Sequence, residues 1–225
     1  MQTSFRELAK DVSERYGAAL TKVASMGVSA MMHGYLAFDK EGNQLCPFRT
    51  WRNTTTEEAA RLLSEKFNFI CLCAGASRIL VRRCSIGGHV KDVDFITTLS
   101  GYVHWKLTGK KVISVGDASG MFPIDSETKT YHAGMMEKFD ALVAGDGYSW
   151  RLGEILPEVL VAGQQAGALT EEGARFWILP ESLKPALSCV RQERRGHRHG
   201  GHQQRGGAYR QCFRRHLCVR YDRAG

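Results

Sequence analysis

The spacing of apolar and polar positions predicts both helices and strands in the first part of the chain. Apolar residues recur at near-helical intervals among charged ones in 4–19, which predicts an amphipathic helix. The stretch 23–32 is apolar and small, which suits a buried strand. The short apolar runs 35–38 and 44–48 flank the polar turn sequence 39–43 and predict a β-hairpin.

Two helices are expected in the middle of the chain. The first covers 57–67, where Thr55 and Glu58 have the spacing of a capping box. The second covers 92–107 and ends at Gly109 as its C-cap. This second window is rich in β-branched residues, so its intrinsic propensity partly favours a strand as well.

Further elements alternate toward the C-terminus. A short strand is predicted at 111–115, and it runs into the Gly-Asp-Ala-Ser-Gly segment 116–120. Helices are predicted at 133–143 and 170–176, and Thr170 has the character of an N-cap because two acidic residues follow it. Alternating helices and strands indicate the α/β fold class.

Two segments depart from this pattern. The stretch 70–88 shows neither a helical nor a strand period, and 189–225 is rich in Arg, His and Gly. The latter holds ten Arg, no Lys, one Glu and one Asp, and its charge of +8 equals the net charge of the whole chain. Six of the seven cysteines lie in these two segments. The composition of the segment 189–225 predicts that it is a disordered basic tail.

Composition narrows the class of protein. With 225 residues, 43% of them hydrophobic, the chain can bury an ordinary globular core. It has no apolar run of the length that a membrane span needs, so no membrane partner is expected. The first residues contain no apolar signal region, so a cytoplasmic location is expected and the cysteines do not predict a disulfide framework.

Four short segments, each weak alone, occur in a recognisable order. They are Ser-Ala-Met-Met-His-Gly at 29–34, Trp-Arg-Asn-Thr at 51–54, Thr-Thr-Leu-Ser-Gly-Tyr-Val-His-Trp-Lys-Leu-Thr-Gly at 97–109, and Gly-Asp-Ala-Ser-Gly at 116–120. Together they resemble the N-terminal, sugar-binding domain of the FGGY carbohydrate kinases, the family of xylulokinase. The resemblance covers about 26–69 and 89–178.

The resemblance implies a fold and a reaction. FGGY kinases have two domains of the actin-like (RNase H-like) ATPase fold, and they transfer the γ-phosphoryl of ATP, with Mg²⁺, to a hydroxyl of a sugar or polyol. Residues 1–188 would form part of the N-terminal domain. The tail 189–225 would stand where the ATP-binding domain begins.

Five residues are candidates for binding the sugar: His33, Trp51, Arg52, Asn53 and Asp117. A polyhydroxylated ligand needs polar groups that donate and accept hydrogen bonds beside a flat apolar wall, and these residue types supply both. The resemblance places the Met-His-Gly and Trp-containing segments at the sugar pocket. The alternative is that His33 and Trp51 are satisfied core residues and that Asp117 belongs to a turn.

The sequence lacks two elements that the family uses for phosphoryl transfer. These are an initial strand and hairpin with an Asp and a Gly-Thr-Thr turn, which handle phosphate and metal, and an Asp that acts as general base at the opening of the second domain. We therefore assign no catalytic residue and no metal ligand. We expect the chain to be inactive alone and to bind neither ATP nor Mg²⁺.

The two unusual segments suggest shifts of reading frame. With permitted codons, 196–206 and 208–224 read in a shifted frame as a small-residue sequence like the start of the kinases' ATP-binding domain. A shift within 73–85 yields the sequence Arg-Trp-Ser-Val-Ala-His-Leu, which is similar to the sequence that family members have at this place. The hypothesis is one compensated frameshift near 70–88 and one uncompensated shift between about 178 and 196.

Other functions remain open for these segments. The tail could bind nucleic acid through phosphate contacts and stacking, although we expect only nonspecific binding to polyanions. Cys212, His216 and Cys218, together with His197, His199 and His202, could hold zinc, but their spacing fits no standard site. Cys71 and Cys73, with Cys84, could form a redox or metal site. A non-catalytic sugar-binding module is a further alternative.

Overall fold

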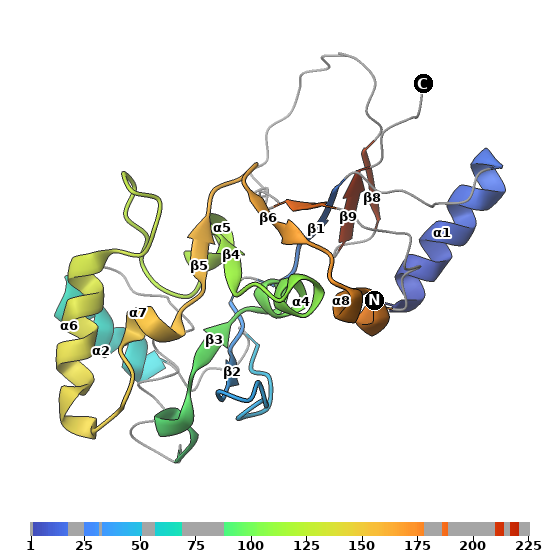
Figure 1. Ribbon diagram of the computed structural model, residues 1–225. Helices are drawn as coiled ribbons and strands as arrows, with labels where there is room; N and C mark the ends of the chain where they lie inside the picture. The colour runs from blue at the N-terminus through green and yellow to red at the C-terminus, as the bar shows by residue number, and fades with distance from the viewer. Residues whose placement is uncertain are drawn as a thin grey trace.

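The computed structural model describes residues 2–17, 25–31, 33–50, 57–68, 88–177, 186–188, 210–213 and 217–220. Helices and strands alternate along these residues, as the α/β class requires (Figure 1). The helices are α1 (Gln2–Tyr16), α2 (Glu57–Phe67), α4 (Leu99–Thr108), α5 (Val115–Ala118), α6 (Ala133–Val143), α7 (Leu152–Ile155) and α8 (Glu171–Trp177), with 3₁₀ turns η2 (Gly88–Asp92) and η3 (Ala144–Asp146). The strands are β1 (Ser25–Val28), β2 (Leu36–Phe38), β3 (Phe95–Thr97), β4 (Val112–Ser114), β5 (Glu158–Leu160), β6 (Gln165–Ala168), β7 (Ala186–Ser188), β8 (Arg210–Phe213) and β9 (Leu217–Arg220).

The strands form one larger sheet and two strand pairs. The larger sheet has the order β6-β7-β1-β9-β8, in which β1 runs parallel to β7 and antiparallel to β9. Strands β2 and β3 pair antiparallel, and β4 and β5 pair parallel. Helix α4 packs against α8 and against β4, so it lies between the larger sheet and the strand pairs (Figure 1).

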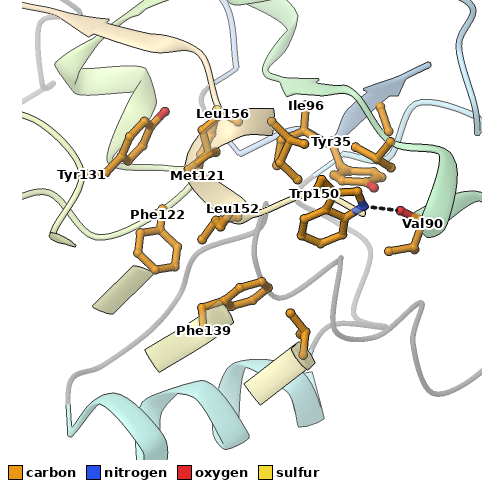
Figure 2. Packing of buried hydrophobic residues seen from close by; sticks show 14 of the residues in the cluster. Tyr35, Val90, Ile96, Met121, Phe122, Tyr131, Phe139, Trp150, Leu152 and Leu156 are labelled. Atoms are coloured by element: carbon orange, nitrogen blue, oxygen red, sulfur yellow. Dashed lines mark hydrogen bonds between the residues drawn. The ribbon is translucent and has the colours of Figure 1, made fainter. Parts of the chain in front are cut away.

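The main hydrophobic core lies between the strand pairs and helices α2, α6 and α7 (Figures 1 and 2). Phe139 and Leu63 are fully buried and bring α6 and α2 together. Trp150 donates a hydrogen bond of 2.8 Å from Nε1 to the carbonyl oxygen of Val90, which satisfies its polar atom within the core (Figure 2).

Most predicted elements are confirmed near their expected positions. The amphipathic helix of 4–19 is α1, and its Leu8 and Ala9 pack on a second, smaller core beside α4. The predicted hairpin turns at 39–43, where Gly42 takes a positive φ of 81°. Its second arm is limited to isolated bridges, since β2 takes its strand partner from β3 instead. The helices predicted at 57–67, 133–143 and 170–176 are α2, α6 and α8.

The helix predicted over 92–107 is wrong in its first half. Residues Phe95–Thr97 form strand β3, whose three side chains are all buried, and helix α4 begins only at Leu99. The β-branched residues in this window account for the difference because they pack well on a pleated, buried surface. Thr98 is the N-cap of α4, and Gly109 is its C-cap with a φ of 72°, as predicted.

Part of the tail also differs from its prediction. We expected disorder throughout 189–225, but β8 and β9 form an antiparallel hairpin in which β9 pairs with β1. An edge strand presents unpaired backbone groups, and pairing with β9 satisfies those of β1 on this side. The rest of this segment lies outside the described residues, as does all of 70–88 except Gly88. The division into 1–188 and 189–225 therefore stays a prediction.

No helix among the residues described here has the length and apolar character needed to cross a bilayer.

Candidate functional site

Asp117 lies at the start of a short helix that directly follows a buried strand. Strand β4 ends at Ser114, which is the N-cap of α5. The Ser114 hydroxyl accepts a hydrogen bond of 3.2 Å from the backbone N–H of Asp117. This arrangement holds the carboxylate of Asp117 in the interior, where only 5% of the residue is exposed. Asp117 therefore belongs to a single helical turn rather than to an exposed loop, and its role in sugar binding stays a prediction.

Two serine hydroxyls hold one oxygen of this carboxylate. Ser100, in the first turn of α4, donates a hydrogen bond of 2.8 Å to Oδ2 of Asp117. Ser114 donates to the same oxygen over 3.2 Å. The Ser100 hydroxyl also lies 2.9 Å from the hydroxyl of Thr98, which caps the helix. The start of α4 and the start of α5 are thereby joined through a single carboxylate oxygen.

Burial dominates the electrostatics of Asp117. Removal from water raises the pKa of its carboxyl group above the ordinary value. The hydrogen bonds from Ser100 and Ser114, and the proximity of His33, act in the opposite direction but do not cancel the effect of burial. A partner that hydrogen-bonds to the ionised carboxylate would relieve this cost.

Three polar atoms in this region lack a hydrogen-bond partner among the described residues. They are Oδ1 of Asp117, Nδ1 of His33 and the hydroxyl of Tyr131, and all three atoms are buried. His33 is half-buried, and it lies close enough to Asp117 to influence the pKa of that group. Burial raises the pKa of Tyr131, and the charge of Asp117 raises it further. Asp117 thus interacts electrostatically with both His33 and Tyr131.

Unpaired buried polar groups are costly and usually have a partner. The unpaired oxygen of Asp117, together with the two other unpaired atoms whose residues interact electrostatically with this carboxylate, therefore indicates a place for a polar ligand or water. A buried atom without a partner is not sufficient by itself. Thr97 also has an unpaired hydroxyl, but a Cβ built on Gly101 would lie 2.1 Å from it. The Gly101 backbone therefore closes off that hydroxyl, and we exclude Thr97 from the site.

The structure brings together two of the five predicted sugar-binding residues. His33 influences the pKa of Asp117, and its Nδ1 has no hydrogen-bond partner among the residues that the structure describes. The choice between a sugar-binding histidine and a core histidine stays a prediction. Trp51, Arg52 and Asn53 lie outside the described residues. Their roles stay predictions.

Sequence reasoning missed three residues around Asp117. Ser114 could have been found, because Ser114 and Asp117 have the Ser-x-x-Asp spacing that marks a helix N-terminus. Ser100 offered a weaker signal, since it follows the N-cap Thr98 by two positions. Tyr131 gave none, because it is brought to the site by a loop whose course the sequence does not reveal.

The described residues do not fit a magnesium–nucleotide site. They contain no group of three or more His, Cys, Asp or Glu side chains placed to hold a metal ion. Asp117 offers a single unengaged oxygen, whereas Mg²⁺ is held by carboxylates, waters and phosphate oxygens in octahedral geometry. What these residues can do is exchange hydrogen bonds with hydroxyl groups, through an acceptor at Asp117, a donor at Tyr131 and a ring nitrogen of His33 that donates or accepts according to its tautomer.

Comparison with known proteins gives the chain its relatives. No family model matches it. It is 26% identical over 172 residues to the xylulose kinase of Haemophilus influenzae, a match covering 72% of this chain and 34% of that protein. A ligand-bound xylulose kinase from Lactobacillus acidophilus superposes with a TM-score of 0.63 at 14% identity, covering 84% of this chain and 38% of the other. A gluconate kinase from the same organism gives a TM-score of 0.63 at 15% identity, with the same coverage.

The fold is that of part of a carbohydrate kinase. The chain is homologous to xylulose kinase, and the resemblance to the FGGY carbohydrate kinases that the four ordered segments indicated is confirmed. The chain spans about a third of the length of the xylulose kinase that it matches.

Proposed function

We propose that this chain carries the sugar-binding portion of an FGGY carbohydrate kinase, and that a sugar or polyol binds between His33 and Asp117. The observation that carries this proposal is that Oδ1 of Asp117 and Nδ1 of His33 are both buried without a hydrogen-bond partner among the described residues, while His33 influences the pKa of Asp117. A vicinal pair of hydroxyl groups can donate to the first atom and exchange a hydrogen bond with the second. Trp51, Arg52 and Asn53 would complete the pocket with an apolar wall and further polar groups.

In the complete kinase reaction, ATP with Mg²⁺ would supply the phosphoryl group for a hydroxyl of the bound sugar. We assign no step of that transfer to the described residues, since they do not fit a metal–nucleotide site. Their contribution is to bind and orient the sugar. A chain that binds the sugar without phosphorylating it would be a non-catalytic sugar-binding module in practice. The location we propose is cytoplasmic.

Titration calorimetry on the full 225-residue chain tests sugar binding. D-xylulose, xylitol and D-gluconate are titrated into the wild type, His33→Asn and the control Glu137→Gln, which changes an exposed residue of α6. We expect saturable binding of at least one of these compounds with a Kd of about 1 mM, equivalent to about −4 kcal/mol. His33→Asn should weaken it and Glu137→Gln should not.

Absence of binding by the wild type to all three compounds contradicts the proposal. A coupled assay with ATP and Mg²⁺ on the same samples is expected to show no sugar phosphorylation. Turnover by the wild type would mean that the chain holds a complete phosphoryl-transfer site.

Binding to nucleic acid through the Arg-rich tail is the alternative function. It would appear as salt-dependent affinity for DNA or RNA that is lost when the chain is cut after Ser188, together with a preference for sequence. We expect only the nonspecific, salt-sensitive part of this behaviour.

A further inference from the structure

Two cysteines lie directly opposite each other in the hairpin that strands β8 and β9 form at the end of the larger sheet (Figure 1). In this antiparallel pair, the register places Cys212 opposite Cys218. Opposed residues of antiparallel strands have Cα atoms about 4.5 Å apart in a non-hydrogen-bonded pair and about 5.5 Å apart in a hydrogen-bonded pair. Both separations fall within the range of about 4.4–6.8 Å that a disulfide bridges. The backbone register therefore meets the distance condition for a bond between these cysteines.

The register also places the cysteine pair away from the face of the sheet that packs on the core. Met26 of β1 lies opposite Val219 of β9, and Met26 is 4% exposed within the smaller core beside α4. Successive residues of a strand lie on opposite faces, so Cys212 and Cys218 occupy positions on the other face. The β1 residue opposite Cys218 is Gly27, which brings no side chain to this face. A bond between the cysteines therefore does not compete with the apolar packing of β1.

Arginines surround the cysteine pair. Arg210 lies opposite Arg220, two positions from the cysteine in each strand and on the same face. Like charges directly opposite each other destabilise an antiparallel pair, so the noncovalent hairpin is weakened at this position. Arg214 and Arg215 lie between the cysteines in the sequence. Nearby positive charge favours the thiolate, which is the form of cysteine that exchanges with disulfides.

We propose that Cys212 and Cys218 form a reversible disulfide that closes the β8–β9 hairpin and holds β9 on the edge of β1. The bond forms by exchange with a low-molecular-weight disulfide. The thiolate of one cysteine attacks the small disulfide and releases one small thiolate, and the thiolate of the other cysteine then attacks the mixed disulfide and releases the second. The two protein thiols are oxidised, the small disulfide is reduced to two thiols, and the released thiolates take up the two cysteine protons.

The register favours this bond over a metal site. Structural zinc is held by four ligands in tetrahedral geometry, whereas the opposed pair supplies two. A disulfide needs only the pair itself. The inference is independent of the proposed sugar site.

Trypsin cleavage between the two cysteines gives a direct measurement of the bond. Cleavage after each arginine of this region separates the peptides 211–214 and 216–220, which a disulfide between Cys212 and Cys218 keeps joined. The full chain is equilibrated with mixtures of oxidised and reduced glutathione and a chelator, in native buffer and in urea. Free thiols are then alkylated before digestion, and the joined peptides are quantified by mass spectrometry.

We expect the equilibrium constant for the cross-link to be at least about tenfold larger in native buffer than in urea, because the sheet raises the effective concentration of one cysteine at the other. Cys212→Ser should carry glutathione on Cys218 instead of a cross-link. Cys189→Ser, which changes a cysteine outside the hairpin, is the control and should keep the joined peptides.

Hydrogen exchange measures whether the bond holds β9 on β1. The amides of 25–28 are compared in the oxidised and the reduced chain. We expect oxidation to slow their exchange by about tenfold, because opening of the sheet at this edge then requires the closed hairpin to leave as a unit. The same treatment should leave the exchange of these amides unchanged in Cys212→Ser.

Two sets of results would overturn the inference. Equal cross-linking in native buffer and in urea, or glutathione adducts without joined peptides, would show that the fold does not bring the two cysteines together. Unchanged exchange of the β1 amides in a fully cross-linked chain would show that the bond does not hold β9 on β1.

Discussion

Ser100 and Asp117, seventeen positions apart in the sequence, are joined by a hydrogen bond of 2.8 Å in which the serine hydroxyl donates to the carboxylate. Both residues are buried, and they link the first turn of α4 to α5. Because Ser114 donates to the same oxygen, the carboxylate is held from one side only. Its other oxygen has no hydrogen-bond partner among the described residues.

Substitution of Asp117 should separate its structural role from its charge. Asp117→Ala leaves the hydroxyls of Ser100 and Ser114 without their acceptor, and we expect it to lower the free energy of unfolding by about 1–3 kcal/mol. Asp117→Asn keeps an acceptor oxygen for both serines and removes a buried charge. It should be as stable as the wild type or more stable at pH 7. Urea denaturation of the three proteins measures this, and equal destabilisation by both substitutions would contradict it.

The raised pKa of Asp117 predicts the sign of a pH dependence. The folded protein binds the proton more tightly than the unfolded chain, so stability falls as the pH rises from the ordinary aspartate value of 3.8 through the raised folded value. Asp117→Asn should lack this component. Urea midpoints for wild type and variant across this range give the difference, and parallel curves would show that Asp117 does not titrate as inferred.

His104 should contribute in the opposite direction. Its Nε2 is 3.1 Å from the carbonyl oxygen of Ala166, which ties α4 to β6. Burial lowers the pKa of His104, and the nearby Lys110 adds to the effect, although the hydrogen bond to Ala166 opposes it. The unfolded chain therefore binds the proton more tightly, and stability is lost as the pH falls from 6.5 through the lowered folded value.

His104→Gln, which retains an N–H donor, should remove this loss of stability while changing little at pH 8. The measurement is the Tm of both proteins between pH 5 and 8. The inference would be contradicted if the difference in Tm between the wild type and the variant were the same at pH 5 as at pH 8.

The contact between α4 and α8 depends on a glycine. A Cβ on Gly173 would lie 2.2 Å from the carbonyl oxygen of Leu107, which is backbone and cannot move aside as a flexible side chain would. Gly173→Ala should therefore cost about 1–3 kcal/mol of stability. Gly145→Ala is the control, since a Cβ there meets no atom within 4 Å. Comparable losses for the two variants in urea denaturation would show that the α4–α8 contact is not tight.

The sequence predicted elements best where local signals agreed. For α8 the N-cap signal of Thr170 and the acidic residues after it predicted the start of the helix, and Thr170 does accept a hydrogen bond from the N–H of Gly173. For 95–97, helical periodicity and β-branched composition conflicted, and burial of the strand decided the outcome.

The candidate site was predictable only in part. His33 and Asp117 were found because they lie in recognisable segments, whereas Tyr131 comes from a loop and Ser100 from a helix start. Which residues surround a carboxylate depends on contacts between elements distant in sequence, and apolar patterning carries no such information. Nothing in the composition of β8 and β9 predicted that their hairpin would extend the sheet at β1.

The most direct measurement is the affinity of the full chain for D-xylulose, xylitol and D-gluconate in the wild type and in Asp117→Asn, by titration calorimetry at pH 7. In the variant, the amide oxygen must face Ser100 and Ser114, so its NH₂ group replaces the unpaired acceptor Oδ1. We expect saturable binding by the wild type and a Kd weakened at least tenfold in the variant, with its fold intact. Equal affinities in the two proteins, or no binding by the wild type, would contradict a sugar site at Asp117.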